Sequence, residues 1–249
     1  MKHIKKFESL DLFNSKQRKE KNKSETLSKI KKFIISRDIE GLKSILTKKN
    51  LIFINEKDLY DTPLMMACEY NNFEAAIFLV ENGADINKKG HAMFSPISKL
   101  IYNRDLNEDG FKIFKLLLNQ PNIDLETTSQ YNDTPLLLSI EVLKRLDMIE
   151  DDDFDDKIHL KIIELLLDKG ANIYAKNHNY KNGIDQSIFD ILIEKENSIY
   201  SSRYIEKILD IILNFAKSKN DKILINLTNK YIKIAEDIIV KYASKKYNL

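Results

Sequence analysis

The stretch "DTPLMMACEYNNFEAAIFLVENGADIN", from Asp61 to Asn87, contains two short helical patterns inside a fixed frame. Thr62 is a residue type that caps helix starts, and Pro63 fits the first helical position, where a backbone N–H has no intrahelical partner. At the other end, Gly83 can adopt the left-handed conformation that closes a helix. The stretch therefore predicts a helix-turn-helix unit bounded by its own start and stop signals.

The apolar residues of this unit lie at helical spacing. One face of the first helix carries Leu64, Ala67 and Cys68, and the second helix carries Ala76, Leu79 and Val80. Two helices of this length leave a long apolar stripe exposed unless neighbouring units stack on it. The unit therefore requires further copies in the same chain.

The opening signal does recur along the chain. Thr62-Pro63-Leu64 is followed by Ser95-Pro96-Ile97 after 33 residues, by Thr134-Pro135-Leu136 after another 39, and by a degraded Ser187-Ile188-Phe189 after another 53. Each opener precedes an apolar helical stretch and then a second one. A recurring unit of about 20–50 residues is typical of stacked arrays.

The segment "TPLMMACEYNNFEAAIFLVENGADIN" resembles an ankyrin repeat, whose pattern includes T-P-L-H-x-A and a period of about 33 residues. The resemblance is closest over residues 59–91 and extends to residues 92–130, 131–178 and 179–216. It implies an all-α ankyrin repeat solenoid with irregular insertions, an N-terminal cap over 24–58 and C-terminal capping helices over 217–249. Residues 24–249 are then a single domain.

Several positions depart from the family pattern. The pattern's histidine is replaced by Met65, Ser98, Leu137 and Asp190, and Asn71 takes the place of the glycine after the first helix. The longest insertion, within residues 146–157, contains Asp151, Asp152, Asp153, Asp155 and Asp156. These residues fail the calcium-loop pattern, because Asp156 replaces its glycine and Ile162 its final glutamate. We interpret the run as a solvated loop, and a contact for a basic partner as the alternative.

Charge is unevenly distributed over the 249 residues. Residues 1–50 carry 15 basic and 6 acidic residues, residues 201–249 carry 10 and 5, and the middle carries 15 and 27. We interpret residues 1–23 as a basic, flexible, solubilising arm. The alternative is that the basic ends bind nucleic acid or an anionic membrane surface. The acidic middle and the lack of interleaved basic and aromatic residues argue against that alternative.

The sequence contains no enzyme signature. It lacks a G-x-x-x-x-G-K loop and an H-E-x-x-H motif, and Ser28-Lys29-Ile30-Lys31 matches S-x-x-K without its companion motifs. Cys68, the single cysteine, takes the position of a small core residue. We therefore predict a protein without catalytic residues, cofactor or metal. No run of about 18 apolar residues and no apolar leader are present, so we expect a cytoplasmic protein without a membrane span.

The resemblance also implies where a partner binds, since ankyrin proteins use the concave surface of the finger loops and first helices. The candidate contact residues are Tyr60, Glu69, Tyr70, His91, Met93, Phe94, Tyr102, Asn103, Gln130, Tyr131, Asn132 and Glu141. Five of them are aligned aromatic residues, and Tyr180 on the fourth finger extends the row. Exposed aromatic residues are enriched among binding hot spots. The alternative is that several of them pack between adjacent fingers.

Together these patterns predict a monomeric, non-enzymatic protein–protein interaction scaffold. It displays a rigid, concave, net acidic surface with aromatic anchors to another protein, and nucleic acid is not expected as its partner. Two alternatives stay open besides binding through the basic ends: an enzyme or toxin-like effector whose activity lies in the ends, and an ankyrin scaffold secreted by a bacterium into a host cell.

Overall fold

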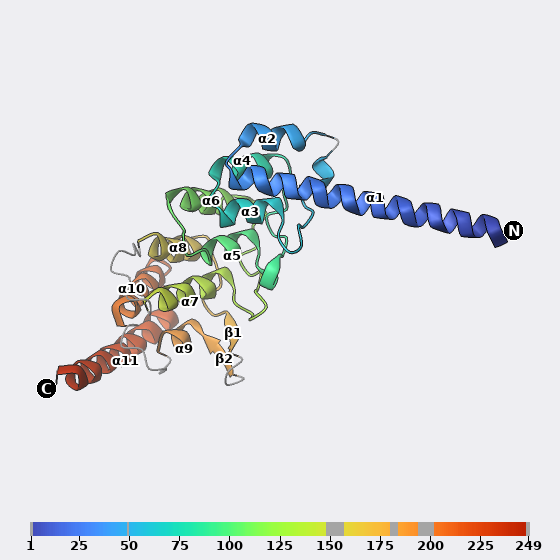
Figure 1. Ribbon diagram of the computed structural model, residues 1–249. Helices are drawn as coiled ribbons and strands as arrows, with labels where there is room; N and C mark the ends of the chain where they lie inside the picture. Colours follow the sequence, from blue (N-terminus) through green and yellow to red (C-terminus); the bar gives the residue numbers. More distant parts are fainter. Residues whose placement is uncertain (1, 49, 148–156, 180–183, 194–201, 248–249) are drawn as a thin grey trace.

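A computed structural model describes residues 2–48, 50–147, 157–179, 184–193 and 202–247. The described chain is mostly helical, as predicted, and its helices lie in two adjacent rows (Figure 1). The first row contains the C-terminal half of α1 (Lys2–Ile35), then α3 (Pro63–Glu69), α5 (Pro96–Ile101), α7 (Pro135–Asp147) and α9 (Ile188–Ile193). The second contains α2 (Ile39–Ile45), α4 (Phe73–Glu81), α6 (Glu108–Leu118), α8 (Lys157–Asp168) and α10 (Ser202–Ser218). Two 3-10 turns, η1 (Leu51–Phe53) and η2 (His91–Met93), lie in the connecting loops.

From α1 to α8, each helix packs on its partner in the other row and on the next helix of its own row. Thus α3 contacts both α4 and α5, while α4 contacts α6 and α6 contacts α8. α11 (Lys222–Tyr247) closes the end by packing on α9 and α10. The interfaces bury one continuous apolar core, which includes Leu64, Leu79, Ile97 and Phe114.

The predicted helix caps are present at the openers. The side chains of Thr62, Ser95 and Thr134 each accept a hydrogen bond from the backbone N–H three residues later, at 3.4 Å. At the degraded fourth opener, the Ser187 N–H donates to the Asp190 carboxylate at 2.9 Å, and the Asp190 N–H donates to the Ser187 hydroxyl at 3.4 Å. This reciprocal cap explains how α9 begins without a proline.

Asn71 shows why asparagine can replace glycine after the first helix. Its backbone is left-handed, with φ +48°, a conformation that asparagine tolerates better than most residues. Its side-chain amide donates to the Asp105 carbonyl oxygen at 2.7 Å. The substitution therefore adds a hydrogen bond to the following unit.

The loop between α8 and α9 corrects the all-α prediction. It forms a two-stranded antiparallel sheet in which β1 (Lys176–Asn179) pairs with β2 (Ile184–Ser187). This finger is longer than those before α5 and α7, so its two arms have room to extend and pair. The His178 N–H also donates to the Tyr131 carbonyl oxygen at 3.2 Å, which docks β1 on the preceding finger. Tyr180, the acidic residues 151–153 and 155–156, and most of their insertion lie outside the described residues.

Residues 2–23, for which the run of basic residues predicts a flexible arm, belong to α1, which projects well beyond the body (Figure 1). The C-terminal half of α1 is anchored by the buried Leu27, Ile30 and Ile34, and Lys23 pairs with Glu56. A helix that is already nucleated extends at little cost through a segment without glycine or proline. Packing at one end therefore supports the helical arm.

Candidate protein-binding surface

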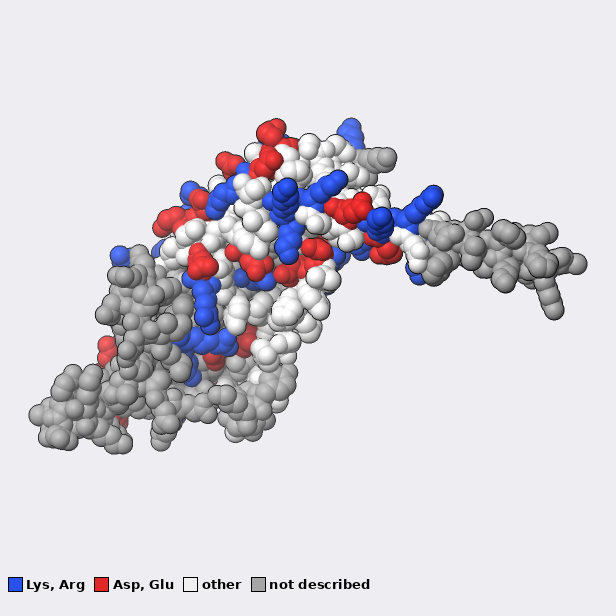
Figure 2. Space-filling view, viewed as in Figure 1, with Lys and Arg blue, Asp and Glu red and all other residues white. Residues whose placement is uncertain are grey.

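The finger loops that precede α3, α5 and α7 expose large apolar side chains. Leu59 is 84 % exposed and Tyr60 61 %, and Met93 and Tyr131 are also exposed. Figure 2 shows mostly uncharged surface along the edge where Figure 1 places these loops. The fingers therefore offer an apolar edge bordered by charged side chains of the helices.

Two of these apolar residues are held in strained backbone. Leu59 and Met93 both have φ +59°, in the left-handed region that favours glycine and asparagine. Such a conformation costs an ordinary L-residue about 1–2 kcal/mol. Asn132, at φ +62° in the third finger, is of a type that tolerates it. Leu59 and Met93 are therefore placed at the fingertips at a cost in stability.

Tyr70 and Tyr102 end α3 and α5, respectively, and both are exposed. Phe94, in contrast, is only 7 % exposed, and its ring centroid lies 5.1 Å from that of Tyr102. The prediction that Phe94 contacts a partner is therefore corrected, because its ring packs against Tyr102 inside the protein. The physical reason is that Phe94 has no polar group to keep in water, so packing its whole ring is favourable.

Arg145, which the sequence did not point to, also positions Tyr102. Its guanidinium carbon lies 5.6 Å from the centroid of the Tyr102 ring, and its Nη1 donates to the Tyr102 hydroxyl at 3.3 Å. This contact reaches from α7 to the end of α5. The sequence carries no signal for it, because the two residues belong to different repeats and to non-equivalent positions.

A cation bridges two carboxylates on the same face. Lys99 Nζ lies 3.0 Å from Asp61 Oδ2 and 3.4 Å from Glu69 Oε2. Burial by itself would lower the pKa of Lys99, but the hydrogen bond and the charge of Asp61, with Glu69, outweigh it, so the pKa is raised. Glu69, a candidate contact residue, is therefore already paired within the protein.

The described first-row helices of the finger units carry side chains of both charges, and the net acidity expected of the whole finger and first-helix surface stays a prediction. Between residues 63 and 145, α3, α5 and α7 carry the acidic side chains of Glu69 and Glu141 and the basic side chains of Lys99, Lys144 and Arg145. Most acidic residues of the middle segment lie in other elements. A partner would therefore meet an apolar edge beside mixed charge.

The candidate asparagines use their amides inside the protein. The Asn103 amide donates to the Glu69 carbonyl oxygen at 2.9 Å, and the Asn132 amide donates to the Lys176 carbonyl oxygen at 3.1 Å. Both bonds join one unit to its neighbour. These residues therefore fix the spacing of the surface as well as lying on it.

The remaining polar candidates also lie along the fingers and first helices. The rings of His91 and Tyr60 meet edge to face with centroids 5.3 Å apart. The Gln130 N–H donates to the Ala92 carbonyl oxygen at 2.9 Å, which joins the second and third fingers, and Glu141 is half-buried on α7. The structure thus brings the candidates of the three described fingers into one row.

A known protein family matches the first finger, α3, α4 and the loop that follows. The family is described as Ankyrin repeat, and its match covers residues 59–88. Residues 59–88 are therefore similar to an ankyrin repeat. The matched segment supplies Leu59, Tyr60, Glu69 and Tyr70 to the candidate surface. A search of curated proteins finds no match to the chain.

Two other kinds of site are absent from the described residues. None of their helices is long and apolar enough to cross a membrane, and within the same ranges no three His, Cys, Asp or Glu side chains are grouped to hold a metal ion. Cys68, inside the matched segment 59–88, is fully buried, and burial raises the pKa of its thiol far above the usual value. A buried thiol in this state is a poor nucleophile.

Proposed function

We propose that this protein is a non-enzymatic scaffold that binds a partner protein through its finger loops and the ends of its first helices. In this proposal the domain is an ankyrin solenoid in which the units 59–91, 92–130, 131–178 and 179–216 stack between terminal caps. The match at residues 59–88 supports the repeat, and the successive packing of α3–α4, α5–α6 and α7–α8 supports the stack.

The observation that carries the proposal is the strain at the fingertips. Leu59 and Met93 are exposed apolar residues in left-handed backbone, 34 positions apart in successive fingers. Glycine or asparagine would relieve the strain and reduce the exposed apolar area. Residues that cost stability in this way cluster at functional sites. A partner that covers both side chains gives them a role.

The tyrosines suit the same role because they are preorganised. Tyr102 is held between Phe94 and Arg145, and Tyr60 is held by the ring of His91. Tyrosine supplies a large contact area with few rotatable bonds, so little side-chain entropy is lost on binding.

We expect a Tyr70→Ala/Tyr102→Ala variant to lose its partner in affinity capture from the native lysate, while the wild type retains it. Removing two hot-spot side chains typically costs more than 2 kcal/mol of binding free energy, or about 30-fold in affinity. The measurement is quantitative mass spectrometry of captured proteins at two salt concentrations.

The matched control is Tyr174→Ala, which removes an exposed tyrosine from the loop after α8 and should leave capture unchanged. Thermal unfolding of all variants checks the fold. If the Tyr70→Ala/Tyr102→Ala variant captures the same proteins as the Tyr174→Ala control and the wild type, the proposed surface is wrong. Salt-labile nucleic acid or lipid recovered equally with every variant would instead move binding to the basic ends.

We expect Leu59→Gly to raise stability while it weakens binding. Relief of the left-handed leucine should increase the free energy of unfolding by about 1 kcal/mol, or roughly 2–4 °C in melting temperature. The captured partner should bind less tightly, because the fingertip side chain is gone. Calorimetry and a titration with the purified partner measure the two effects, and a variant that melts below the wild type contradicts the strain argument.

A further inference from the structure

The β1–β2 hairpin has one covered edge and one open edge. On the β1 side, the His178 N–H donates to the Tyr131 carbonyl oxygen and the Asn132 amide donates to the Lys176 carbonyl oxygen. On the other side, β2 has β1 as its strand neighbour and no further strand among the described residues. Figure 1 shows the hairpin at the end of the row of fingers, with β2 outermost.

The register decides which backbone groups lie along the open edge. His178 stands directly opposite Asp185. Opposite residues in an antiparallel pair either exchange both backbone hydrogen bonds or both point theirs outward. Because the His178 N–H goes to Tyr131, this pair is of the second kind. The Asp185 N–H and C=O groups therefore point away from β1, into the open edge.

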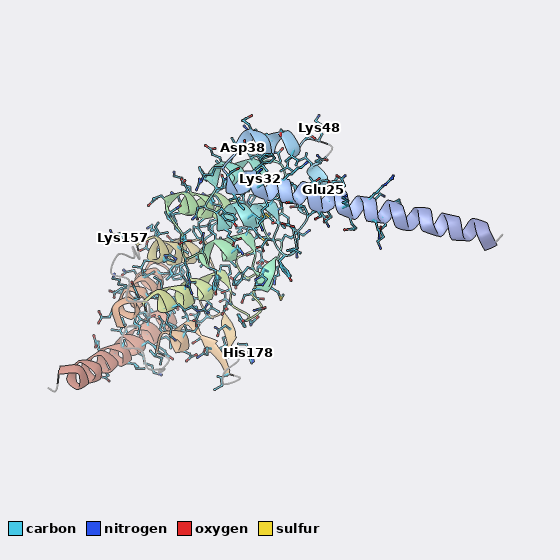
Figure 3. The ribbon with its side chains drawn as sticks, viewed as in Figure 1. Glu25, Lys32, Asp38, Lys48, Lys157 and His178 are labelled. Carbon is cyan, nitrogen blue, oxygen red and sulfur yellow. The ribbon has the colours of Figure 1, made fainter. Side chains whose placement is uncertain are left out.

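The side chains along this edge specify what would fit beside it. The carboxylate of Asp185 is 66 % exposed and lies 3.0 Å from His178 Nδ1 on one face of the hairpin. Ile184, on the opposite face, is 59 % exposed. Figure 3 shows His178 at the periphery of the molecule. An added strand would place a side chain beside the carboxylate and its neighbours beside the isoleucine.

The geometry points to the open edge of β2 as a docking site for an extended segment of a partner protein, which adds to the hairpin as a third strand. The segment carries a lysine or arginine opposite Asp185 and an apolar residue opposite Ile184. It continues a series of backbone hydrogen bonds that already joins the fingers, from Gln130 to Ala92 and from His178 to Tyr131. This site is separate from the tyrosine surface of the proposed function and shares with it only a protein as partner.

A fluorescent heptapeptide of alternating valine and lysine tests the site. The control peptide has the same length and pattern but carries glutamate in place of each lysine. Asp185→Pro removes the outward N–H, and proline is tolerated on an edge strand at such a position. Asp185→Ala keeps the N–H and removes the charge. We expect the lysine peptide to bind the full-length protein, about tenfold more weakly after Asp185→Pro and several-fold more weakly after Asp185→Ala.

Charge reversal provides a test that does not depend on proline. Asp185→Lys should bind the glutamate peptide in preference to the lysine peptide, which reverses the wild-type order. Hydrogen exchange should show that bound peptide protects the Asp185 amide, while slow exchange at the His178 amide confirms an intact hairpin in every variant.

The inference is overturned if the lysine peptide does not bind the wild type. It is also overturned if the peptide binds equally well after all three substitutions of Asp185. Self-association that Asp185→Pro abolishes in sedimentation overturns it too, since the occupant would then be a second copy of this chain. Tyr70→Ala/Tyr102→Ala should leave peptide binding unchanged. Failure of the tyrosine surface and failure of the β2 edge can therefore be told apart.

Discussion

Replacing Phe114 with alanine should lower the free energy of unfolding by about 3–5 kcal/mol, because the change leaves a cavity in a close-packed core. Phe114 lies on α6, is fully buried and is among the largest side chains excluded from solvent. α6 packs on α4, α5 and α8, so the loss is felt across neighbouring helix pairs. Urea unfolding followed by circular dichroism measures the change.

The matched control is Phe111→Ala on the same helix. The two rings stack with centroids 6.2 Å apart, but Phe111 is only half-buried and lies beneath the ammonium group of Lys115. Its loss should cost roughly 1–2 kcal/mol, since water can fill part of the space. Equal destabilisation by the two substitutions would contradict the packing described here.

Lys99→Met should be the next most damaging change, with an expected loss of about 2 kcal/mol. It leaves Asp61, whose side chain is 15 % exposed, without its cation, and it removes the bridge to Glu69. Breaking a fully buried ion pair costs about 3–5 kcal/mol, and partial exposure reduces that figure here. Glu69→Gln, at the more exposed end, should cost about 0–1 kcal/mol.

A double-mutant cycle with Asp61→Asn isolates the pair. Asparagine keeps an acceptor for the His91 N–H, which Asp61 Oδ1 binds at 3.2 Å. We expect Lys99→Met to cost much less in the Asp61→Asn background than in the wild type. Additive losses would show that Lys99 acts through packing of its aliphatic stem instead.

The same pair predicts an alkaline loss of stability. The pKa of Lys99 is raised in the folded protein, so its contribution is complete below the ordinary lysine value of 10.5 and is lost as the pH rises through the folded-state value. Wild-type stability should therefore fall more than that of Lys99→Met as the pH rises above 10.5. Parallel pH profiles would contradict the pairing.

Local sequence signals predicted much of the helical framework. Thr62, Ser95 and Thr134 each cap a helix, and Gly83 has the left-handed φ of +89° that its position predicts. These features depend on residues within a single turn of one another. The hairpin and the long α1 were not predicted, because strand pairing and the anchoring of a helix by its distant half depend on contacts across the fold.

The candidate surface was predicted only in outline. The spacing of the openers was enough to put Tyr60, Tyr70, Tyr102 and Tyr131 on equivalent parts of the units, and all four are exposed. It did not distinguish Phe94, which has the same aromatic character but is buried beneath Tyr102. Nor did it indicate Arg145 or the Lys99 bridge, because charge pairs between units do not recur at a fixed spacing in the sequence.

The sequence by itself determined where the capped helices begin and which of their faces are apolar, since these follow from short-range geometry. It also predicted that the units stack, from the need to bury apolar area. The tertiary structure decided which exposed residues remain available. Lys99 and Arg145 neutralise or position their neighbours. Tyr131 covers one edge of the hairpin, while the part of the chain that the structure describes places no further strand beside Asp185. Such outcomes depend on distances between side chains and strands far apart in the chain, which no local pattern specifies.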